Sequence, residues 1–251
     1  MIDAIILAGG QMTGSLKEAF PEVQNKAHLL LQDKMLLEHV LQAVLDSPRI
    51  DKIYVVGDKN FLCKQLKQER VQILSSSADI YENFMRAAQL TTRPRVLLLT
   101  ADIPLITGAI LTDFIERCVR NPADICYSIV NRKNIEEFAP TSKRTYATLQ
   151  EGTFTGGNVF MVKVAALEQA KAGVDKIFAK RKSVWGLANL IGWGFLLKWA
   201  FTKISLRTVE LRASKLLGCQ AKAIISPYAA IGIDVDKISD WQLVKEQLEK
   251  I

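Results

Sequence analysis

The amino-acid sequence predicts an α/β fold, in which a mostly parallel sheet lies between layers of helices. Three short runs, Ala4–Leu7, Lys52–Val56 and Arg95–Thr100, have the apolar composition of strands that are buried on both faces. The segment Leu36–Leu45 follows the first run and has the apolar spacing of a helix with one buried face. Strands that alternate with helices in this way indicate parallel pairing through crossover connections.

The same patterns place further elements along the chain. Helices are expected at 61–69, 80–90 and 109–120, and strands at 125–130, 159–162 and 221–225. A closing helix is expected from Ser239 to Lys250, with Ser239 as its N-cap and Asp240 in its first turn.

Size and composition indicate one globular domain. The chain has 251 residues, of which 49% are hydrophobic and 24% charged, the balance of a soluble protein. We expect a single domain over 1–251 with a helical insert at about 165–217. The four cysteines lie far apart without a CxxC pair, which argues against a zinc site or a disulfide scaffold. The start of the sequence lacks the pattern of a signal peptide, and we expect a cytoplasmic protein.

The positive charge of the chain is concentrated in one segment. The net charge is +7, but Lys171–Lys222 alone holds eleven Lys or Arg against two acidic residues, so the rest of the chain is slightly acidic. No zinc finger spacing, aromatic-basic RNA motif or basic C-terminal tail accompanies this segment, and we expect no nucleic-acid partner.

The middle of the basic segment is unusually apolar. Val184–Leu197 contains a single polar side chain, Asn189, and is too short to span a bilayer. Four interpretations stay open: a lid over a second substrate, a buried helix, a homodimer contact, and an interfacial helix that makes peripheral contact with a membrane.

A glycine-rich loop follows the first strand. Gly9 and Gly10 have no side chain between their backbone N–H groups and a bound anion, so the loop is suited to a phosphate. The spacing is neither GxGxxG nor the GK[ST] of a P-loop, and a glycine turn without a ligand stays an alternative.

Two further segments have polar residues next to predicted strands, where ligands could bind. Asp102 follows the strand Arg95–Thr100, where parallel sheets bind ligands, and its carboxylate suits Mg²⁺. Gly156, Gly157 and Asn158 precede a strand, where the backbone could approach a ligand and the Asn amide could bind hydroxyl groups. A hairpin turn at the two glycines is nearly as compatible with the pattern.

The order of these motifs resembles the MobA-like NTP-transferase superfamily, and the chain is similar to its sugar-phosphate nucleotidyltransferases. The counterparts of the family pattern are Leu7–Gly10, Lys26–Ala27, Lys34–Met35, Asp102–Leu105 and the Asp-x-Asp of Asp234–Asp236. The resemblance covers nearly the whole chain and implies a Rossmann-like three-layer α/β/α sandwich, the GT-A-like fold of nucleotide-diphospho-sugar transferases. Two departures are Ile238, where the family has Pro, and the absence of a loop arginine, for which Lys17 or Gln11 is the candidate substitute.

The resemblance also implies roles for particular residues. Lys26 would neutralise the triphosphate, and Asp102 with Asp236 would hold Mg²⁺ or Mn²⁺, with Asp234 as a close alternative because alternation along an extended segment places both on one face. Gly156, Gly157 and Asn158 would face the acceptor. The nucleotide-binding set is Leu7, Ala8, Gly9, Gly10, Gln11, Lys17, Lys26 and Ser76, the last as a candidate contact to the base.

The implied reaction is Mg²⁺-dependent transfer of an NMP group from an NTP to a phosphorylated small acceptor, such as a sugar phosphate, with release of pyrophosphate. Its partners would be the NTP and the acceptor. Two other functions stay open: a GT-A-type glycosyltransferase that uses a nucleotide sugar, and a degenerate nucleotide-binding domain that associates with a membrane or a protein partner.

Overall fold

The central sheet has eight strands within the described residues, which are 1–180, 192 and 202–250 of the computed structural model. Seven of them lie side by side in the order β10-β7-β9-β6-β1-β4-β5, and β8 pairs with β9. Their bounds are β1 Ile2–Leu7, β4 Ile50–Gly57, β5 Val71–Ser75, β6 Arg95–Thr100, β7 Ile125–Asn131, β8 Ala147–Leu149, β9 Gly152–Lys163 and β10 Ala221–Ser226. A separate two-stranded sheet joins β2 (Leu30–Leu31) to β3 (Lys34–Met35).

The predicted parallel pairing is confirmed for most of the sheet. β1 is parallel to β4 and β6, β4 to β5, and β7 to β10. β9 is antiparallel to both β6 and β7, and β8 is antiparallel to β9. The strand predicted at 159–162 forms the second half of β9, but no sequence pattern predicted its reversed direction or its extension back to Gly152 through the Gly-Gly-Asn segment.

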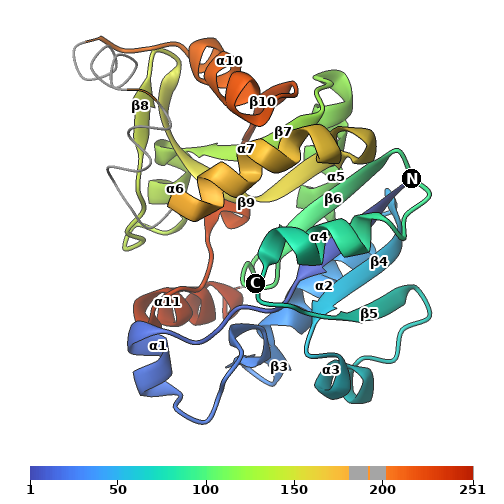
Figure 1. Ribbon diagram of the computed structural model, residues 1–251. Coiled ribbons are helices and arrows are strands. Elements are labelled where there is room, and N and C mark those ends of the chain that lie inside the picture. Colours follow the sequence, from blue (N-terminus) through green and yellow to red (C-terminus); the bar gives the residue numbers. More distant parts are fainter. Residues whose placement is uncertain (181–191, 193–201, 251) are drawn as a thin grey trace.

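Helices cover both faces of the sheet, which gives the three-layer α/β/α sandwich that was predicted (Figure 1). Their bounds are α1 Gly14–Ala19, α2 Leu36–Asp46, α3 Lys59–Gln65, α4 Ile80–Ala88, α5 Gly108–Arg120, α6 Arg132–Phe138, α7 Leu167–Lys180, α10 Leu206–Leu217 and α11 Ile238–Leu248, with 3-10 turns η1 Lys26–His28, η2 Val164–Ala166 and η3 Ala229–Gly232. The alternation of β1 explains the layers, because Ala4 and Ile6 face the core under α2 and α5 while Ile5 faces the core under α4.

Several boundaries differ from the sequence prediction, and at two helices the N-terminal cap explains the difference. The helix expected at 61–69 spans Lys59–Gln65, because Asp58 caps its start by accepting a hydrogen bond from the Phe61 N–H. The closing helix begins at Ile238, so the prediction of Ser239 as its N-cap is wrong. Asp240 supplies the capping oxygen from inside the helix by accepting from the Lys237 N–H at 3.0 Å.

The described part of the predicted insert is mainly helical. α7 and α10 pack against each other and cover β7, β9 and β10 on the face that carries α4. The predictions for the apolar segment Val184–Leu197 fall on residues 181–191 and 193–201, which lie outside the described residues. Among the described helices, none has the length and apolar character needed to cross a membrane.

Candidate active site

The glycine loop is held in place by a neighbouring segment that includes Asn25. The Asn25 side-chain amide donates to the Ala8 carbonyl at 2.8 Å, and its oxygen accepts from the Ala27 N–H at 2.9 Å. The Lys26 N–H donates to the Gly10 carbonyl at 2.8 Å. Gly9 and Gly10 remain exposed between these anchors. The loop therefore presents an open backbone at the carboxyl end of β1, where a phosphate site was predicted.

Lys26 lies at the centre of the site. Its Nζ is 2.5 Å from Asp102 Oδ2 and 2.6 Å from Asp236 Oδ1. Burial acts to lower the pKa of Lys26, but the two carboxylates outweigh it and raise the pKa above its ordinary value. A permanently charged ammonium thus joins residues that are up to 210 positions apart in sequence.

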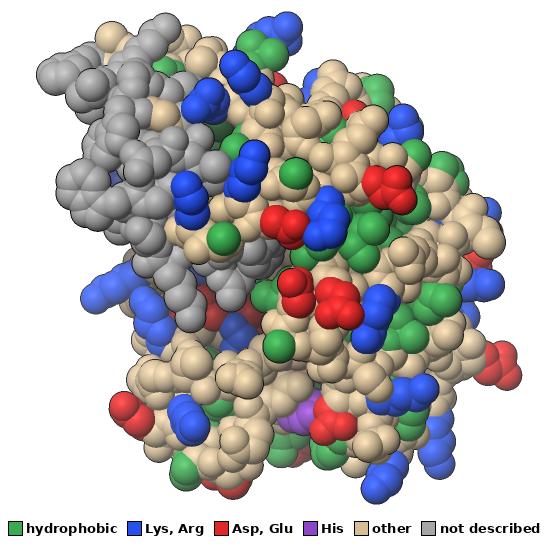
Figure 2. Space-filling model, viewed as in Figure 1, with side chains coloured by type: hydrophobic (Ala, Val, Ile, Leu, Met, Phe, Trp, Pro, Cys, Tyr) green, Lys and Arg blue, Asp and Glu red, His purple; other side chains and the backbone are tan. Residues whose placement is uncertain are grey.

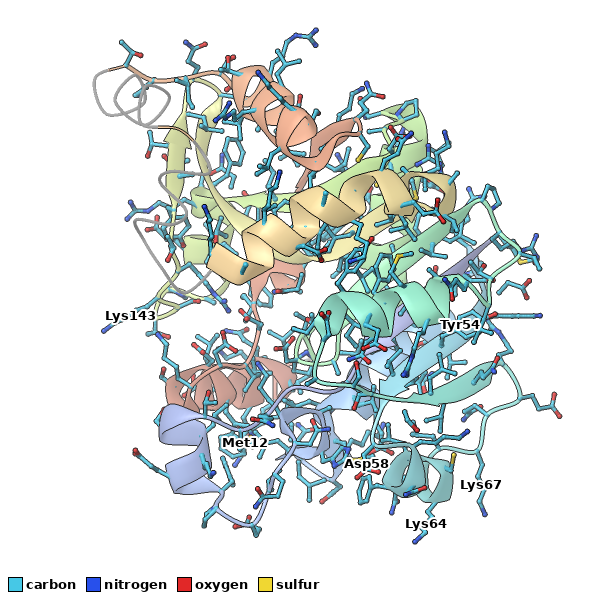
Figure 3. All side chains as sticks on the ribbon, viewed as in Figure 1. Met12, Tyr54, Asp58, Lys64, Lys67 and Lys143 are labelled. Atoms are coloured by element: carbon cyan, nitrogen blue, oxygen red, sulfur yellow. The ribbon has the colours of Figure 1, made fainter. Side chains whose placement is uncertain are left out.

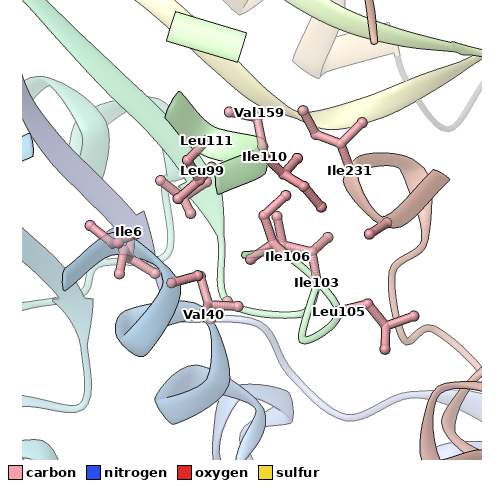
Figure 4. Close-up of a cluster of buried hydrophobic side chains, with 14 of the residues drawn as sticks. Ile6, Val40, Leu99, Ile103, Leu105, Ile106, Ile110, Leu111, Val159 and Ile231 are labelled. Atoms are coloured by element: carbon pink, nitrogen blue, oxygen red, sulfur yellow. The ribbon is translucent and has the colours of Figure 1, made fainter. Parts of the chain in front are cut away.

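The position of Asp102 is fixed by the residues on either side of it in the sequence. It lies two residues beyond Thr100, the last residue of β6, and its Oδ1 accepts from the Thr100 hydroxyl at 2.5 Å. The next residues, Ile103, Leu105 and Ile106, are at most 4% exposed and belong to the main core (Figure 4). Because the segment that bears Asp102 is anchored by buried side chains, its carboxylate has little freedom to move.

Asp234 and Asp236 reach the same place from the extended segment before α11. Carboxylate oxygens of Asp102, Asp234 and Asp236 all lie within 4.8 Å of one another. The Val235 N–H between the two donates to the Asp102 carbonyl at 2.9 Å, and the Asp236 N–H donates to Asp240 Oδ2 at 3.1 Å. The structure thus brings the three predicted carboxylates together.

The pKa values of Asp234 and Asp236 are shifted in opposite directions. Burial raises the pKa of Asp234 to about 6, although the Arg144 guanidinium beside it acts in the opposite direction. Burial also acts to raise the pKa of Asp236, but the hydrogen bond and the charge of Lys26 hold that pKa below its usual range. Arg144 also donates through Nη2 to the Asp234 carbonyl at 3.1 Å. This arginine lies between α6 and β8, and no sequence motif marked it.

The Gly-Gly-Asn segment lies within β9, so a hairpin turn at the two glycines is excluded. The reversal is at Gln150–Glu151, between β8 and β9. The pairing with β7 shifts here, because Tyr127 opposes Phe160 while Ile129 opposes Gly156. The buried Ser128 stabilises this irregularity, since its hydroxyl donates to the Val159 carbonyl at 2.9 Å and accepts from the Val159 N–H at 3.3 Å.

A polar cavity of about 400 Å³ lies beside the carboxylate cluster. It contains Gly156, Gly157 and Asn158 together with Asp234 and Asp236. The residues of its lining that no sequence motif marked as a site are Tyr127, Lys143, Arg144, Thr145, Thr155, Lys237 and Asp240. Of these lining residues, Lys143 is exposed, and its side chain points away from the body of the molecule in Figure 3.

The remaining predicted nucleotide contacts lie at different places around this centre. Ser76 is across from Gly9, where a methyl group in place of the glycine hydrogen would be 3.3 Å from Ser76 Cβ. Gln11 forms an isolated bridge with Asn25. Lys17 is exposed in the last turn of α1. Ala8 is fully buried and Leu7 half-buried, so only their backbone could face a nucleotide.

The carboxylate cluster fits a divalent metal. Three hard oxygen donors within reach of one ion suit Mg²⁺ or Mn²⁺. The position of the Lys26 ammonium between two of them shows that this point favours a cation.

Comparison with known proteins gives the class of the molecule. Residues 4–172 match the MobA-like NTP transferase domain. A hypothetical transferase from Thermus thermophilus is 30% identical, with a TM-score of 0.81 over 96% of this chain and 100% of that one. A CMP:2-keto-3-deoxy-manno-octonic acid synthetase in complex with CTP is 11% identical, with a TM-score of 0.63 over 99% and 98% of the two chains. The 2-C-methyl-D-erythritol 4-phosphate cytidylyltransferase of Francisella tularensis is 12% identical, with a TM-score of 0.59 over 98% and 100%. No curated protein sequence matches the chain.

The fold, the shared domain and the ordered motifs define a nucleotidyltransferase. The chain belongs to the family of proteins with a MobA-like NTP transferase domain.

Proposed function

We propose that this protein transfers an NMP group from an NTP to a phosphorylated small acceptor, with Mg²⁺ as cofactor and pyrophosphate as the second product. The proposal rests mainly on one observation. The Lys26 Nζ lies 2.5 Å from an Asp102 oxygen and 2.6 Å from an Asp236 oxygen, and Lys26 follows the exposed glycines of the loop to which its N–H is bonded. A cytoplasmic location, where NTP and Mg²⁺ are available, belongs to the same proposal.

The glycine loop and the polar cavity would each bind one of the two substrates. The backbone of Gly9 and Gly10 and the ammonium of Lys26 would hold the triphosphate, and Asn158 with Arg144 would face the acceptor. Asp102, Asp234 and Asp236 would hold the metal, which supplies further charge neutralisation on the phosphates when bound.

In the reaction, an oxygen of the acceptor phosphate forms a bond to the α-phosphorus as the bond from that phosphorus to the bridging oxygen of pyrophosphate breaks. A phosphate monoester is largely ionised at pH 7, so the nucleophile needs no protein base. The contribution of the chain is then alignment of the two substrates and stabilisation of negative charge by Lys26.

The test is thermal stabilisation by each of the four NTPs, with and without Mg²⁺, because a ligand of the native state raises its stability. We expect a metal-dependent shift with one NTP, followed by pyrophosphate release when a phosphorylated acceptor is added. Asp102→Asn should lose the metal dependence, and the exposed Asp33→Asn should keep it as a matched control.

Two results would overturn the proposal. A shift with nucleotide sugars and none with NTPs would favour a glycosyltransferase. The absence of any shift would favour a domain without nucleotidyltransfer activity.

A further inference from the structure

A second cavity, of about 370 Å³, lies between α10 and the surface of β7, β9 and β10. Its described walls are almost entirely apolar and include Ile129, Leu149, Phe154, Phe160 and Val209. The polar side chains among the described lining residues are Tyr127, Thr155, Glu210 and Lys222. A cavity of this size and composition is typical of sites that bind apolar groups.

The helix over this cavity leaves its apolar side incompletely packed. Leu206, Val209, Ala213 and Leu217 all line the cavity from α10. The structure nevertheless has no buried residue in this helix. The apolar side of α10 is therefore open to a further apolar group between the helix and the sheet.

The apolar cavity shares a wall with the polar cavity of the candidate active site. Tyr127, Thr155 and Gly156 line both. The Tyr127 ring stacks on Phe160 with 4.6 Å between ring centroids, and its hydroxyl lies so close to Gly156 that a side chain there would overlap it. Tyr127 thus lies at the boundary of the two cavities, with its ring against Phe160 of the apolar one.

We propose that the acceptor is a phosphorylated amphiphile, whose phosphate head occupies the polar cavity and whose hydrocarbon tail occupies the apolar cavity beneath α10. This inference rests on the proposed function and names the substrate class of the same site. The continuity of the two cavities through Tyr127, Thr155 and Gly156 carries it, because a small sugar phosphate would fill the polar cavity alone.

The charge around α7 and α10 agrees with such a substrate. Lys176, Lys180, Arg207 and Lys215 are exposed on these two helices. Figure 2 shows Lys and Arg side chains distributed over this face of the molecule. Membranes that contain phosphorylated amphiphiles have an anionic surface, and such a surface attracts basic side chains.

The experiment compares two probes that differ only in the hydrocarbon chain, octyl phosphate and methyl phosphate. Their affinities for the full-length protein are measured by calorimetry at concentrations at which octyl phosphate forms no micelles. We expect octyl phosphate to bind at least tenfold more tightly, because each buried methylene favours binding. Val209→Trp, which fills the apolar cavity, should abolish this difference. Leu211→Trp makes the same change on the same helix at a side chain that is 61% exposed, and should retain the difference.

Equal affinities for the two probes, or a difference that survives Val209→Trp, would overturn the inference. Failure of octyl phosphate to bind, combined with a large loss of thermal stability in ligand-free Val209→Trp, would mean that the chain itself fills the cavity, which also overturns it. If octyl phosphate does not bind and Val209→Trp dissociates a dimer, the cavity is filled by a second copy of the chain, which also overturns the inference. Stabilisation by NTP and Mg²⁺ is measured in parallel, so that loss of the tail preference is distinguished from failure of the proposed function.

Discussion

At the scale of single residues, charge is the dominant feature of the site. Lys26 lies between two carboxylates and Arg144 contacts a third, so each acidic side chain of the cluster has a basic partner within the described structure. Removing one member of such a set leaves the remaining charges partly buried without compensation. Substitutions at these positions should therefore affect both activity and stability, and the two effects must be measured separately.

Lys26→Ala should lower the rate of pyrophosphate release by about 10²-fold or more, because the ammonium that stabilises charge on the phosphates is lost. The exposed Lys64→Ala on α3 is the matched control and should keep full activity. The measurement is steady-state release of pyrophosphate with the NTP identified by thermal stabilisation. Full turnover by Lys26→Ala would contradict the role given to this lysine.

His28 predicts a pH dependence of stability. Burial lowers the pKa of His28 below its ordinary 6.5, against the charge of Asp58, and its Nε2 has no hydrogen-bond partner within the described structure. Its ring stacks on Phe61 with 4.2 Å between centroids. Between the lowered pKa and 6.5 the unfolded chain binds more protons than the folded one, so the free energy of unfolding should rise with pH in this window. The measurement is the free energy of unfolding, from urea titrations at a series of pH values. His28→Leu should show a smaller rise of this free energy with pH than the unmodified protein. An identical dependence on pH in the two proteins would refute the prediction.

At the scale of elements, close packing around β9 restricts which residues can stand beside the site. Gly157 is buried in the irregular part of this strand, and a side chain there would overlap the Ser128 hydroxyl and lie 3.0 Å from the Ile231 carbonyl. The absence of a side chain at this position therefore has a packing reason that is independent of the acceptor. Asn158, the next residue, is half-buried and lines the polar cavity.

Gly157→Ala should lower the free energy of unfolding by roughly 1–3 kcal/mol, the range for overpacking of a well-packed interior. Urea titration of Gly157→Ala, Asn158→Ala and the double variant Ser128→Ala/Gly157→Ala separates the causes. With Ser128→Ala alone as the reference, Gly157→Ala should cost less stability in the Ser128→Ala background, because the overlapping hydroxyl is gone. Asn158→Ala should retain stability and raise the KM of the acceptor; the opposite pattern would reverse the roles of the two residues.

At the scale of the whole molecule, the site depends on contact between the two ends of the chain. α11 packs against α1, and the Trp241 indole N–H donates to the Leu30 carbonyl at 3.0 Å. The Trp241 ring lies 5.3 Å from the Phe20 ring between centroids, and the Ile238 N–H donates to Ser15 Oγ at 3.2 Å. These contacts hold Asp236, which precedes α11, beside the glycine loop.

Trp241→Ala should lower the free energy of unfolding by roughly 1–3 kcal/mol, less than for a fully buried Trp because this side chain is only half-buried. It should also reduce stabilisation by NTP and Mg²⁺, since Asp236 loses its support. The exposed Gln242→Ala is the control on the same helix. Unchanged ligand stabilisation in a destabilised Trp241→Ala would show that α11 supports the fold without positioning the site.

Much of the fold followed from local patterns in the sequence. The apolar runs and the helical spacing of Leu36–Leu45 marked elements that the structure contains, because buried strands and amphipathic helices have distinctive periodicities. The antiparallel direction of β9 was not predictable in this way, since the pattern of a buried strand is the same for both directions. The error at Ser239 has a different origin, because Asp240 accepts from the Lys237 N–H from inside the first turn and the N-cap is Lys237, two residues before Ser239.

The sequence by itself determined the class of the protein and marked the glycine loop, Lys26, Asp102 and the Asp-x-Asp of Asp234–Asp236 as candidates for the site. These residues belong to short local motifs, and the order of the motifs along the chain identifies the family. Only the tertiary structure decided which other side chains join them. Arg144, Tyr127 and Ser128 reach the site or support it through pairings between distant segments, and no local pattern marks them. The apolar cavity under α10 has the same origin, because its walls come from this helix and from the strands β7 to β10, which only the fold brings together.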